Sequence, residues 1–230
     1  MKIEQVLSER LQAVTELVTK GNRVADIGCD HAYTSIYLVE KGIAPCAIAM
    51  DINAGPIERA KENVLLYGLA DKIAVRRSDG VKELDAGEAD TLLITGMGGL
   101  LMKKILSDKP EVTNAAKELV LQPQSEVEEL RRFLHSIGFV ITEEQMRKEE
   151  GKFYVMFRAE QKEVSVWTDL EYRYGAYLLK ERPAVFLEYI AWELQQKEQI
   201  LANLEQIETE KAMVRKEQLR REIEELQQLL

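Results

Sequence analysis

Short apolar runs alternate with longer amphipathic segments along the first two thirds of this chain. Five runs predict buried strands, at residues 24–27, 46–51, 73–75, 91–95 and 119–121. Apolar residues at helical spacing lie between most of these runs and predict helices, and a further amphipathic segment predicts a helix over residues 3–19. Pro56 is expected at the first position of its helix, and Ser125 is expected to cap another.

This order of elements predicts a single α/β sheet. Strands that alternate with helices form parallel sheets, because each helix returns the chain to the edge where the strand began. Residues 139–142 and 153–157 predict two more strands, joined by a short connection at residues 149–152. We therefore expect a mostly parallel sheet with one antiparallel strand at its end, in a domain that spans residues 1–162.

The last part of the chain has a different pattern. Residues 184–230 contain no glycine or proline, and their apolar residues recur in heptads flanked by charges. One seam ends at Leu204 and a second begins at Leu219, fifteen residues later, so the two seams are out of phase. A break around residues 208–215 favours an antiparallel helical hairpin, and one continuous helix that recruits a second chain is the alternative. We predict a separate α-helical coiled-coil domain over residues 163–230.

Composition narrows the classes of protein. The 230 residues carry a formal net charge of −9, which argues against coating nucleic acid by bulk charge but permits a local basic surface. No run of 18 apolar residues is present and the N-terminus is polar, so we expect a cytoplasmic protein without a membrane span. Cys29 and Cys46 form no CxxC pair, so we expect no metal. We expect a monomer or a weak dimer.

The segment from Val24 to Ser35 carries the first candidate chemistry. Asp26 and Gly28 end a strand and Asp30 opens the next helix, an arrangement that brings backbone N–H groups close to a ligand. The Asp30 carboxylate would attract a sulfonium and repel a pyrophosphate, which favours S-adenosylmethionine over NAD. The alternatives are that Asp30 caps the following helix and that Asp26 caps backbone groups at the turn.

Acidic residues also follow the second and third strands. Asp51 comes 21 residues after Asp30, the spacing of a strand–helix–strand unit, and could accept both ribose hydroxyls of a cofactor. Asp79-Gly80 fits a pocket for the cofactor's adenine, or is an ordinary Asp-Gly turn. His31 and Ile52, which adjoin two of these acids, complete the cofactor residues predicted from the first three strands.

Thr95-Gly96-Met97-Gly98-Gly99 follows the fourth strand, at the substrate-facing edge of the sheet. Its glycines would allow a base or cofactor to approach closely, or would form a tight strand–helix turn. We expect the cofactor at Thr95, Gly96 and Met97, and the substrate at Gly98 and Gly99. Lys103 and Lys104 come next and could meet phosphates, although a solvated helix surface is the ordinary role of such a pair.

These motifs resemble those of the bacterial TrmK family. The segments that match in order are DIGCDHAY, AMDIN, SDG, TGMGG, LQPQ and GKFYV, within about residues 4–160. Residues 168–230 match the family's C-terminal coiled coil in character. TrmK proteins are tRNA (adenine-22-N1)-methyltransferases that use S-adenosylmethionine. The resemblance therefore implies a Rossmann-like, seven-stranded methyltransferase sheet, this activity and tRNA as the partner.

Methylation of adenine N1 has its own chemical requirements. The ring nitrogen has a free lone pair, so attack needs no prior deprotonation, and the product is cationic. A carboxylate beside the base would stabilise that charge or orient the amino group, which makes Asp30 the catalytic candidate. Tyr33 and Tyr154 are candidates to stack on a flipped base, whereas Phe153 is more typical of a core residue.

Two other classes of function stay open. A non-catalytic, cofactor-binding scaffold could recruit a partner through its coiled coil, although Gly28, Asp30 and Asp51 argue against it. A small-molecule methyltransferase is the other, and the lack of an obvious lid domain argues against that. For tRNA, the helical domain offers one basic cluster within an acidic segment: Arg215, Lys216, Arg220 and Arg221.

Overall fold

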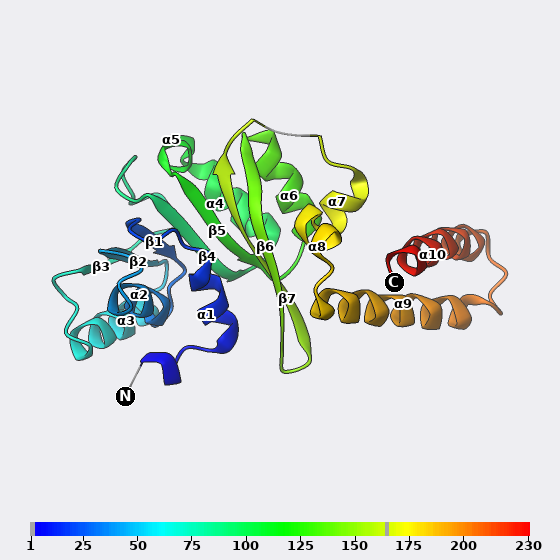
Figure 1. Cartoon of the computed structure of the whole chain (residues 1–230), viewed down its shortest axis with the longest axis horizontal. Helices are drawn as coiled ribbons and strands as arrows, with labels where there is room; N and C mark the ends of the chain where they lie inside the picture. Colours follow the sequence, from blue (N-terminus) through cyan, green and yellow to red (C-terminus); the bar gives the residue numbers. More distant parts are fainter. Residues whose placement is uncertain (1–2, 164–165) are drawn as a thin grey trace. The chain divides into compact units, whose positions relative to one another are not determined.

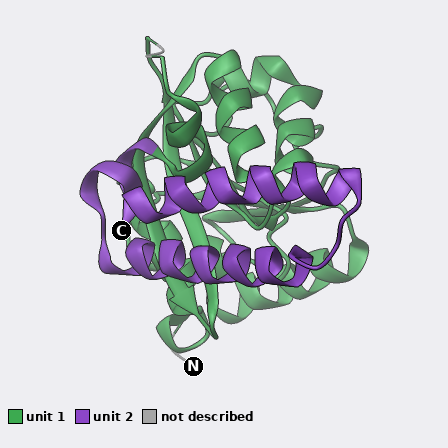
Figure 2. Cartoon of the chain, turned by 90° about the vertical axis from the view of Figure 1, so that its right-hand side faces the viewer, with its two compact units in different colours: residues 1–175 green, residues 176–230 purple. Residues whose placement is uncertain are grey.

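The computed structural model describes residues 3–163 and 166–230. It divides into two compact units, Met1–Gly175 and Ala176–Leu230, which Figure 2 shows in different colours. The strands all belong to the first unit: β1 (Val24–Ile27), β2 (Ala47–Asp51), β3 (Ile73–Arg77), β4 (Thr91–Met97), β5 (Glu118–Pro123), β6 (Phe139–Glu149) and β7 (Lys152–Gln161). Its helices are η1 (Ile3–Gln5), α1 (Glu9–Glu16), α2 (Tyr33–Glu40), α3 (Ala54–Leu66), α4 (Gly99–Asp108), α5 (Pro110–Ala115), α6 (Val127–Ser136) and α7 (Asp169–Tyr174).

The seven strands form one sheet in the order β3-β2-β1-β4-β5-β7-β6 (Figure 1). The first five strands pair in parallel, and β7 is antiparallel to both β5 and β6. The predicted mostly parallel sheet with one antiparallel strand is confirmed. That strand lies between β5 and β6 rather than at the edge, because the β6–β7 hairpin folds back onto β5.

Helices cover both faces of the sheet. Helix α2 packs against α1 and α3 on one face, and α4 packs against α5 and α6 on the other (Figure 1). Strands β1 and β5 are buried along their whole length, as expected for strands covered on both sides. The direction of winding reverses between β1 and β4, and in doubly wound sheets the crevice at the carboxyl ends of such strands is the usual ligand site.

Three predicted helix starts are wrong. The N-terminal segment is not one helix, because Ser8 separates η1 from α1 and its hydroxyl accepts a hydrogen bond from the Leu11 N–H at 3.4 Å. Helix α3 begins at Ala54, which makes Pro56 its third residue rather than its first. Ser125 does not cap α6, which follows Glu126 instead, and the left-handed φ of 49° at Glu126 turns the chain into the helix.

Several strands extend beyond their predicted bounds. Strands β6 and β7 are 11 and 10 residues long, because each pairs with the other far past the apolar residues that predict them. The two strands meet at Glu150-Gly151, within the predicted connection. The outer part of this hairpin consists mainly of charged residues. It lacks the alternation of apolar and polar residues that predicts a strand, so the sequence does not identify it as one.

The second unit contains α8 (Ala176–Glu181), α9 (Ala184–Leu204) and α10 (Glu210–Leu229), and α9 and α10 pack against each other (Figure 2). Their pairing is antiparallel: Arg182 donates to the Leu229 carbonyl at 2.7 Å, and Lys197 meets Glu222 at 2.6 Å. The predicted hairpin is confirmed and the continuous helix is wrong. Residues 205–209 connect the two helices. Thr209 caps the start of α10, since its hydroxyl accepts a hydrogen bond from the Ala212 N–H at 3.3 Å.

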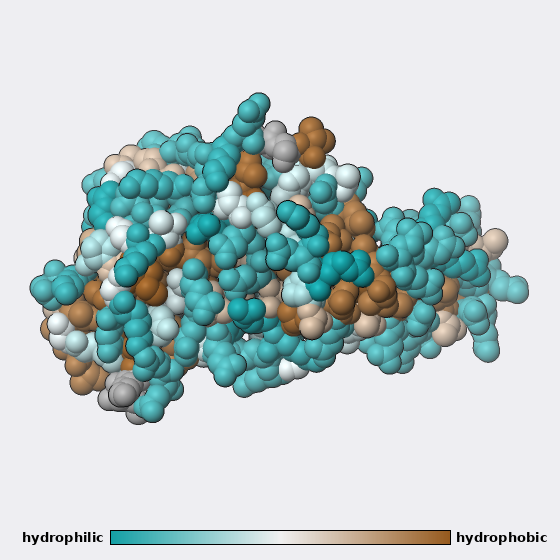
Figure 3. Space-filling view, in the orientation of Figure 1, coloured by the Kyte–Doolittle hydropathy of each residue, from teal (hydrophilic) through white to brown (hydrophobic). Residues whose placement is uncertain are grey.

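The apolar seam of α10 is largely the predicted one. The heptad spacing predicts Leu219, Ile223, Leu226 and Leu230 in this seam; the first three are buried, but Leu229 is buried in place of Leu230, which is exposed. The compact units divide at Gly175, and the domain division between residues 162 and 163 stays a prediction. The face of the protein in Figure 3 is mainly hydrophilic, with apolar residues in separate small patches, as the high content of charged residues leads one to expect.

Candidate active site

A cavity of about 330 Å³ lies at the carboxyl ends of β1, β2, β3 and β4. Four strand ends and helix α4 contribute its lining: Ile27, Gly28, Asp51, Ile52, Asn53, Ser78, Asp79, Gly80, Thr95, Gly96, Met97, Leu101, Lys104, Ile105 and Asp108. This is the switch point of the sheet, and the volume is in the usual range for small-ligand sites. Eight of the predicted cofactor residues therefore meet in one place: Gly28, Asp51, Ile52, Asp79, Gly80, Thr95, Gly96 and Met97.

Gly28 forms the turn where β1 reaches the cavity. Its φ is +78°, and its N–H donates to the Met50 carbonyl at 2.8 Å. A Cβ at this position would lie 2.1 Å from the Met97 methyl carbon, so a side chain would displace Met97. The positive φ is what favours glycine here, since the end of the flexible Met97 side chain could move aside.

Asp51 ends β2 with its carboxylate at the cavity. One oxygen, Oδ1, accepts a hydrogen bond from the Asn53 N–H at 2.8 Å, which fixes the orientation of the carboxylate. No hydrogen bond to Oδ2 is found among the described residues. Arg77 supports the same turn from β3, since its Nε donates to the Ile52 carbonyl at 2.9 Å. A held carboxylate with an available oxygen suits a hydroxyl-bearing ligand.

Asp79 and Gly80 follow β3. The ammonium of Lys82 pairs with the exposed Asp79 carboxylate, and the hydrogen bond between them lowers the pKa of Asp79. Gly80 has a φ of +60°, and a Cβ there would be 3.1 Å from the Ile105 side chain. The Asp79-Gly80 turn thus lies directly beside helix α4, and both contribute to the lining of the cavity.

The glycines of Thr95–Gly99 have two different surroundings. Thr95, Gly96 and Met97 line the cavity, whereas Gly98 and Gly99 do not. A Cβ on Gly99 would lie 2.6 Å from the Glu126 carbonyl oxygen, and the Gly99 N–H donates to the Ser125 carbonyl at 2.9 Å. The second pair of glycines therefore allows the β4 loop to pack against the loop after β5. The structure does not place these two glycines at the substrate.

Asp26 is buried in the middle of β1 and does not reach the cavity. The residue is 2% exposed, and its carboxylate accepts a hydrogen bond from the Ser35 hydroxyl at 2.7 Å. Burial raises the pKa of Asp26 to about 6, and the bond from Ser35 opposes that shift. The carboxylate also accepts a backbone hydrogen bond from Ser35, in the first turn of α2, which fits the predicted alternative that Asp26 caps backbone groups after β1.

Asp30 and His31 lie outside the cavity lining, with the Asp30 carboxylate 60% exposed. Arg59 of α3 meets this carboxylate at 3.1 Å, and His31 Nε2 lies 3.3 Å from it. The His31 ring stacks on Tyr33, with ring centroids 5.4 Å apart. The N-cap of α2 is Ala32 and makes no side-chain hydrogen bond, so the alternative that Asp30 caps this helix is wrong.

The predicted substrate residues are dispersed. Lys104 lines the cavity, but Lys103 pairs with Glu129 at 2.6 Å and does not. The Tyr154 ring of β7 is covered on one side by the Arg10 guanidinium, 4.8 Å from the ring centroid. Only Lys104 of these candidates therefore meets the predicted cofactor residues in the cavity.

Comparison with known proteins gives the family. The family model of tRNA (adenine(22)-N(1))-methyltransferase, TrmK, matches residues 24–228. The chain is 36% identical to the tRNA (adenine(22)-N(1))-methyltransferase of Bacillus subtilis over 208 residues, 88% of this chain and 87% of that protein. This chain belongs to the TrmK family. The resemblance seen in the motifs is confirmed.

Two solved structures of relatives contain ligands. Streptococcus pneumoniae Sp1610 in complex with S-adenosyl-L-methionine has a TM-score of 0.87 and 31% identity, over 97% of this chain and 99% of that one. M. capricolum TrmK with S-adenosyl-homocysteine has a TM-score of 0.84 and 25% identity, over 96% of each chain. The seven-stranded methyltransferase fold of this TrmK chain is therefore shared with relatives that bind this cofactor pair.

Six cavity residues of this TrmK chain are missing from the predicted cofactor and substrate residues. They are Ile27, Asn53, Ser78, Leu101, Ile105 and Asp108. Ile27, Asn53 and Ser78 lie inside the matching segments DIGCDHAY, AMDIN and SDG, and that position is the signal that could identify them. Leu101, Ile105 and Asp108 come from one face of α4, which no motif marks. Arg59 is likewise not predicted, because only the folded chain brings α3 beside Asp30.

Neither a metal site nor a membrane span is evident in residues 3–163 and 166–230. No group of three or more His, Cys, Asp or Glu side chains there could hold a metal ion. Within the same residues, no helix combines the length and the apolar character that crossing a membrane requires.

Proposed function

We propose that this chain transfers the methyl group of S-adenosylmethionine to N1 of adenosine 22 in tRNA. The observation that carries the proposal is the cavity at the switch point of the sheet, within a chain that belongs to the TrmK family. The chain covers 87% of the Bacillus subtilis tRNA (adenine(22)-N(1))-methyltransferase, so the likeness extends through both compact units.

The cavity residues fit S-adenosylmethionine. Gly28, at φ +78°, forms the turn at the cavity without a side chain, and Asp51 Oδ2 can accept from ribose hydroxyls. We assign Asp51, Ile52, Asp79 and Gly80 to the nucleoside part, with Thr95, Gly96 and Met97 at the opposite wall. The bound cofactor supplies an electrophilic methyl group. Asp26 and His31, which do not line the cavity, would act on the cofactor only through the backbone turn that they support.

Asp30 remains the proposed catalytic residue. Adenine N1 attacks with its own lone pair, so the chain needs to position the base and stabilise the positive charge that develops on it. Asp30 is exposed beside the β1 turn, and Arg59 fixes its carboxylate at 3.1 Å. Arg59 offsets part of the negative charge, so orientation of the base by the carboxylate is the larger part of the proposed role. The neighbouring Tyr33, stacked on His31, is proposed to present its ring to the base.

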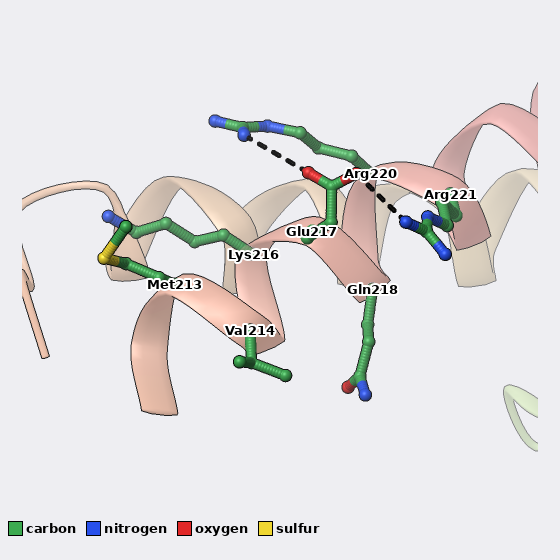
Figure 4. A pocket seen from close by; sticks show the side chains of 7 residues that line it. All are labelled: Met213, Val214, Lys216, Glu217, Gln218, Arg220 and Arg221. Atoms are coloured by element: carbon green, nitrogen blue, oxygen red, sulfur yellow. Dashed lines mark hydrogen bonds and ion pairs between the residues drawn. The ribbon is translucent and has the colours of Figure 1, made fainter. Parts of the chain in front are cut away.

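Lys104 and the helical hairpin are the proposed contacts for tRNA phosphates. A second, larger hollow of about 690 Å³ lies along α10, but it is open surface formed by successive turns of one helix (Figure 4). Its lining includes Lys216, Arg220 and Arg221, and Figure 4 shows Glu217 paired with both arginines. The cluster is therefore basic but partly neutralised, and we propose it as a weak, distant phosphate contact rather than a site for a small molecule.

Four further properties belong to the same proposal. We propose that the reaction needs no metal, that the protein is cytoplasmic and that it is a monomer or a weak dimer. Analytical ultracentrifugation at several concentrations measures the last of these. We also propose that residues 1–162 and 163–230 correspond to a catalytic and a helical domain. Limited proteolysis would contradict this division if cleavage consistently spared residues 163–175.

The decisive experiment is methylation of tRNA in vitro. Purified protein, S-adenosylmethionine and unmodified tRNA are incubated, and the nucleosides and fragments are identified by mass spectrometry. We expect N1-methyladenosine at position 22, and none when adenosine 22 is replaced by guanosine. Cofactor binding without any methyl transfer would instead favour the non-catalytic scaffold.

A further inference from the structure

The cavity wall at Gly96 is held by a side chain from the neighbouring strand. The β4–β5 register shifts between Thr95 and Met97, so Gly96 is an extra residue in the ladder. Its N–H donates to the Oε1 atom of Gln122 at 3.2 Å, and Gln122 is fully buried. Gly96, a bulge residue beside the proposed methyl-transfer site, thus depends on the Gln122 side chain for the hydrogen bond of its backbone N–H.

The orientation of the Gln122 amide is determined by its partners. Its Nε2 donates to the Pro123 carbonyl at 3.1 Å, and its Oε1 accepts from both Gly96 and the Arg10 guanidinium. A buried amide whose oxygen has two donors has little freedom to turn. Arg10 therefore contributes directly to holding the acceptor that Gly96 needs.

Arg10 itself is fixed by Glu149 at the end of β6. One oxygen of this carboxylate accepts from the Arg10 backbone N–H at 3.2 Å, and the other from its Nε at 3.4 Å. The Arg10 side chain is 16% exposed and covers the Tyr154 ring. Helix α1 is thus tied to the β6–β7 hairpin and to the β4 loop through one arginine.

We propose that Arg10 is a positioning residue for methyl transfer, acting through Gln122 to hold the Gly96–Met97 wall of the cavity. The inference rests on the proposed function and adds a residue that lies outside the sequence motifs of the family. Without the guanidinium, Gln122 Oε1 loses one of its two donors and a space opens beside the amide. The amide can then turn, and the Gly96 N–H loses its acceptor. Small displacements of a cavity wall reduce the chemical step more than they reduce binding.

The test is a double-mutant cycle in the full-length protein. Arg10→Met, Gln122→Leu and the double variant are compared by kcat at saturating S-adenosylmethionine and tRNA. We expect about a 10-fold loss of kcat for Arg10→Met and at least as large a loss for Gln122→Leu. The double variant should lose no more than Gln122→Leu alone, since both changes interrupt one contact chain. Arg10→Lys, which retains a donor, should recover part of the rate.

Arg23→Met is the matched control. Arg23 also pairs with a carboxylate, Asp90 at 2.8 Å, but at the amino-terminal edge of the sheet, away from the cavity. The Arg23→Met substitution should lower the melting temperature of the protein without lowering kcat. Normal kcat for Arg10→Met with only a lower melting temperature would overturn the proposal. Losses that multiply in the double variant would overturn the route through Gln122.

A structural readout separates this inference from the proposed function. The methyl group of Met97, labelled with ¹³C and assigned with Met97→Leu, reports the position of the cavity wall without any methyl transfer. Its NMR signal should move in Arg10→Met and Gln122→Leu but not in Arg23→Met. If wild-type protein methylates no tRNA, the proposed function fails while this measurement still tests the wall. An unmoved Met97 signal contradicts the positioning role even if the enzyme is active.

Discussion

The cavity edge of the sheet and the α9–α10 hairpin use charge in opposite ways. At the cavity, the Asp51 carboxylate is oriented by a backbone N–H and keeps one oxygen without a partner among the described residues. On the hairpin, charged side chains pair with each other: Arg215 meets Glu222 at 3.0 Å, and Glu217 meets Arg221 at 3.4 Å. Asp51 is thus held with one oxygen available, although Asp79 in the same cavity pairs with Lys82, whereas the charges of the hairpin surface are mainly paired with each other.

The same contrast extends to the backbone. The cavity is built from Gly28, Gly80 and Gly96, all with positive φ, at turns where side chains would collide with neighbours or strain the chain. The hairpin has regular helices and an apolar seam, so its structure tolerates changes at the surface. We therefore expect chemistry to depend on residues 1–175 and docking of the large substrate to depend on residues 176–230, a division that substitutions and truncation can break.

Removing residues 176–230 should have the largest effect. We place the cut after Gly175 so that helix α7 stays with the first unit. The carbonyls of Tyr172 and Arg173 accept hydrogen bonds there from the buried Arg131, at 3.0 and 2.9 Å. We expect kcat/KM for tRNA to fall at least about 100-fold, because the whole helical unit is lost and not only its four clustered cations, with cofactor affinity nearly unchanged. Calorimetry with S-adenosylmethionine and tRNA kinetics measure the two, after circular dichroism confirms folding. Full tRNA activity in the truncated protein would refute the docking role.

Asp51→Ala should weaken cofactor binding about 30-fold, because ribose hydroxyls would lose a charged acceptor. Calorimetric titration with S-adenosyl-homocysteine measures the dissociation constant without turnover. Asp71→Ala is the matched control, since it removes an aspartate that follows α3 but does not line the cavity. Equal affinities for wild type and Asp51→Ala would exclude Asp51 from the site.

Asp30→Ala should lower kcat about 10-fold and change tRNA affinity less, because orientation of the base acts mainly in the chemical step. Arg59→Met tests the partner and should produce a smaller loss, since the carboxylate stays but is less fixed. Single-turnover kinetics and tRNA binding assays separate the two quantities. A normal rate for Asp30→Ala would leave the residue with no part in the reaction.

Replacement of Arg215, Lys216, Arg220 and Arg221 by glutamine should have a modest effect. Each full phosphate contact contributes nearly one unit to the slope of log affinity against log salt. Because acidic neighbours already neutralise part of the cluster, we expect a change of about 1–2 units and a few-fold rise in KM at low salt. The measurement is KM for tRNA over a range of potassium chloride concentrations. An unaltered slope would place the docking surface elsewhere.

Asp26→Asn should leave activity nearly unchanged and alter stability. Burial raises the pKa of Asp26 to about 6, so the folded protein holds this proton more tightly than the unfolded chain does. The stabilisation is fully present below about pH 4 and is lost as the pH rises through about 6. The variant lacks this titration and should exceed wild type by about 1–3 kcal/mol in free energy of unfolding at about pH 7–8. Urea unfolding from about pH 4 to 8 measures the difference in free energy of unfolding. If this free energy changes with pH in the same way for wild type and variant, Asp26 is not the cause.

The sequence by itself determined the order of strands and helices, the family and most of the cavity lining. These follow from local rules: apolar periodicity identifies each element, and residues that end parallel strands gather at one edge of the sheet. Gly28, Asp51 and Asp79 can therefore be assigned to one site from the order of the elements alone. The heptad phase likewise predicted the hairpin, since a break in phase is visible along the chain.

Only the tertiary structure decided how the side chains are used. Gly98 and Gly99 proved to serve loop packing, and Asp26 proved to be buried under α2. Arg59 and Arg10 became relevant because folding brings them to Asp30 and Gln122, 29 and 112 residues away. Such contacts depend on which helix packs on which strand end, and no local pattern encodes them. The order of residues along the chain thus predicts most of the cavity lining, whereas the packing of helices on the sheet decides the contacts of each side chain.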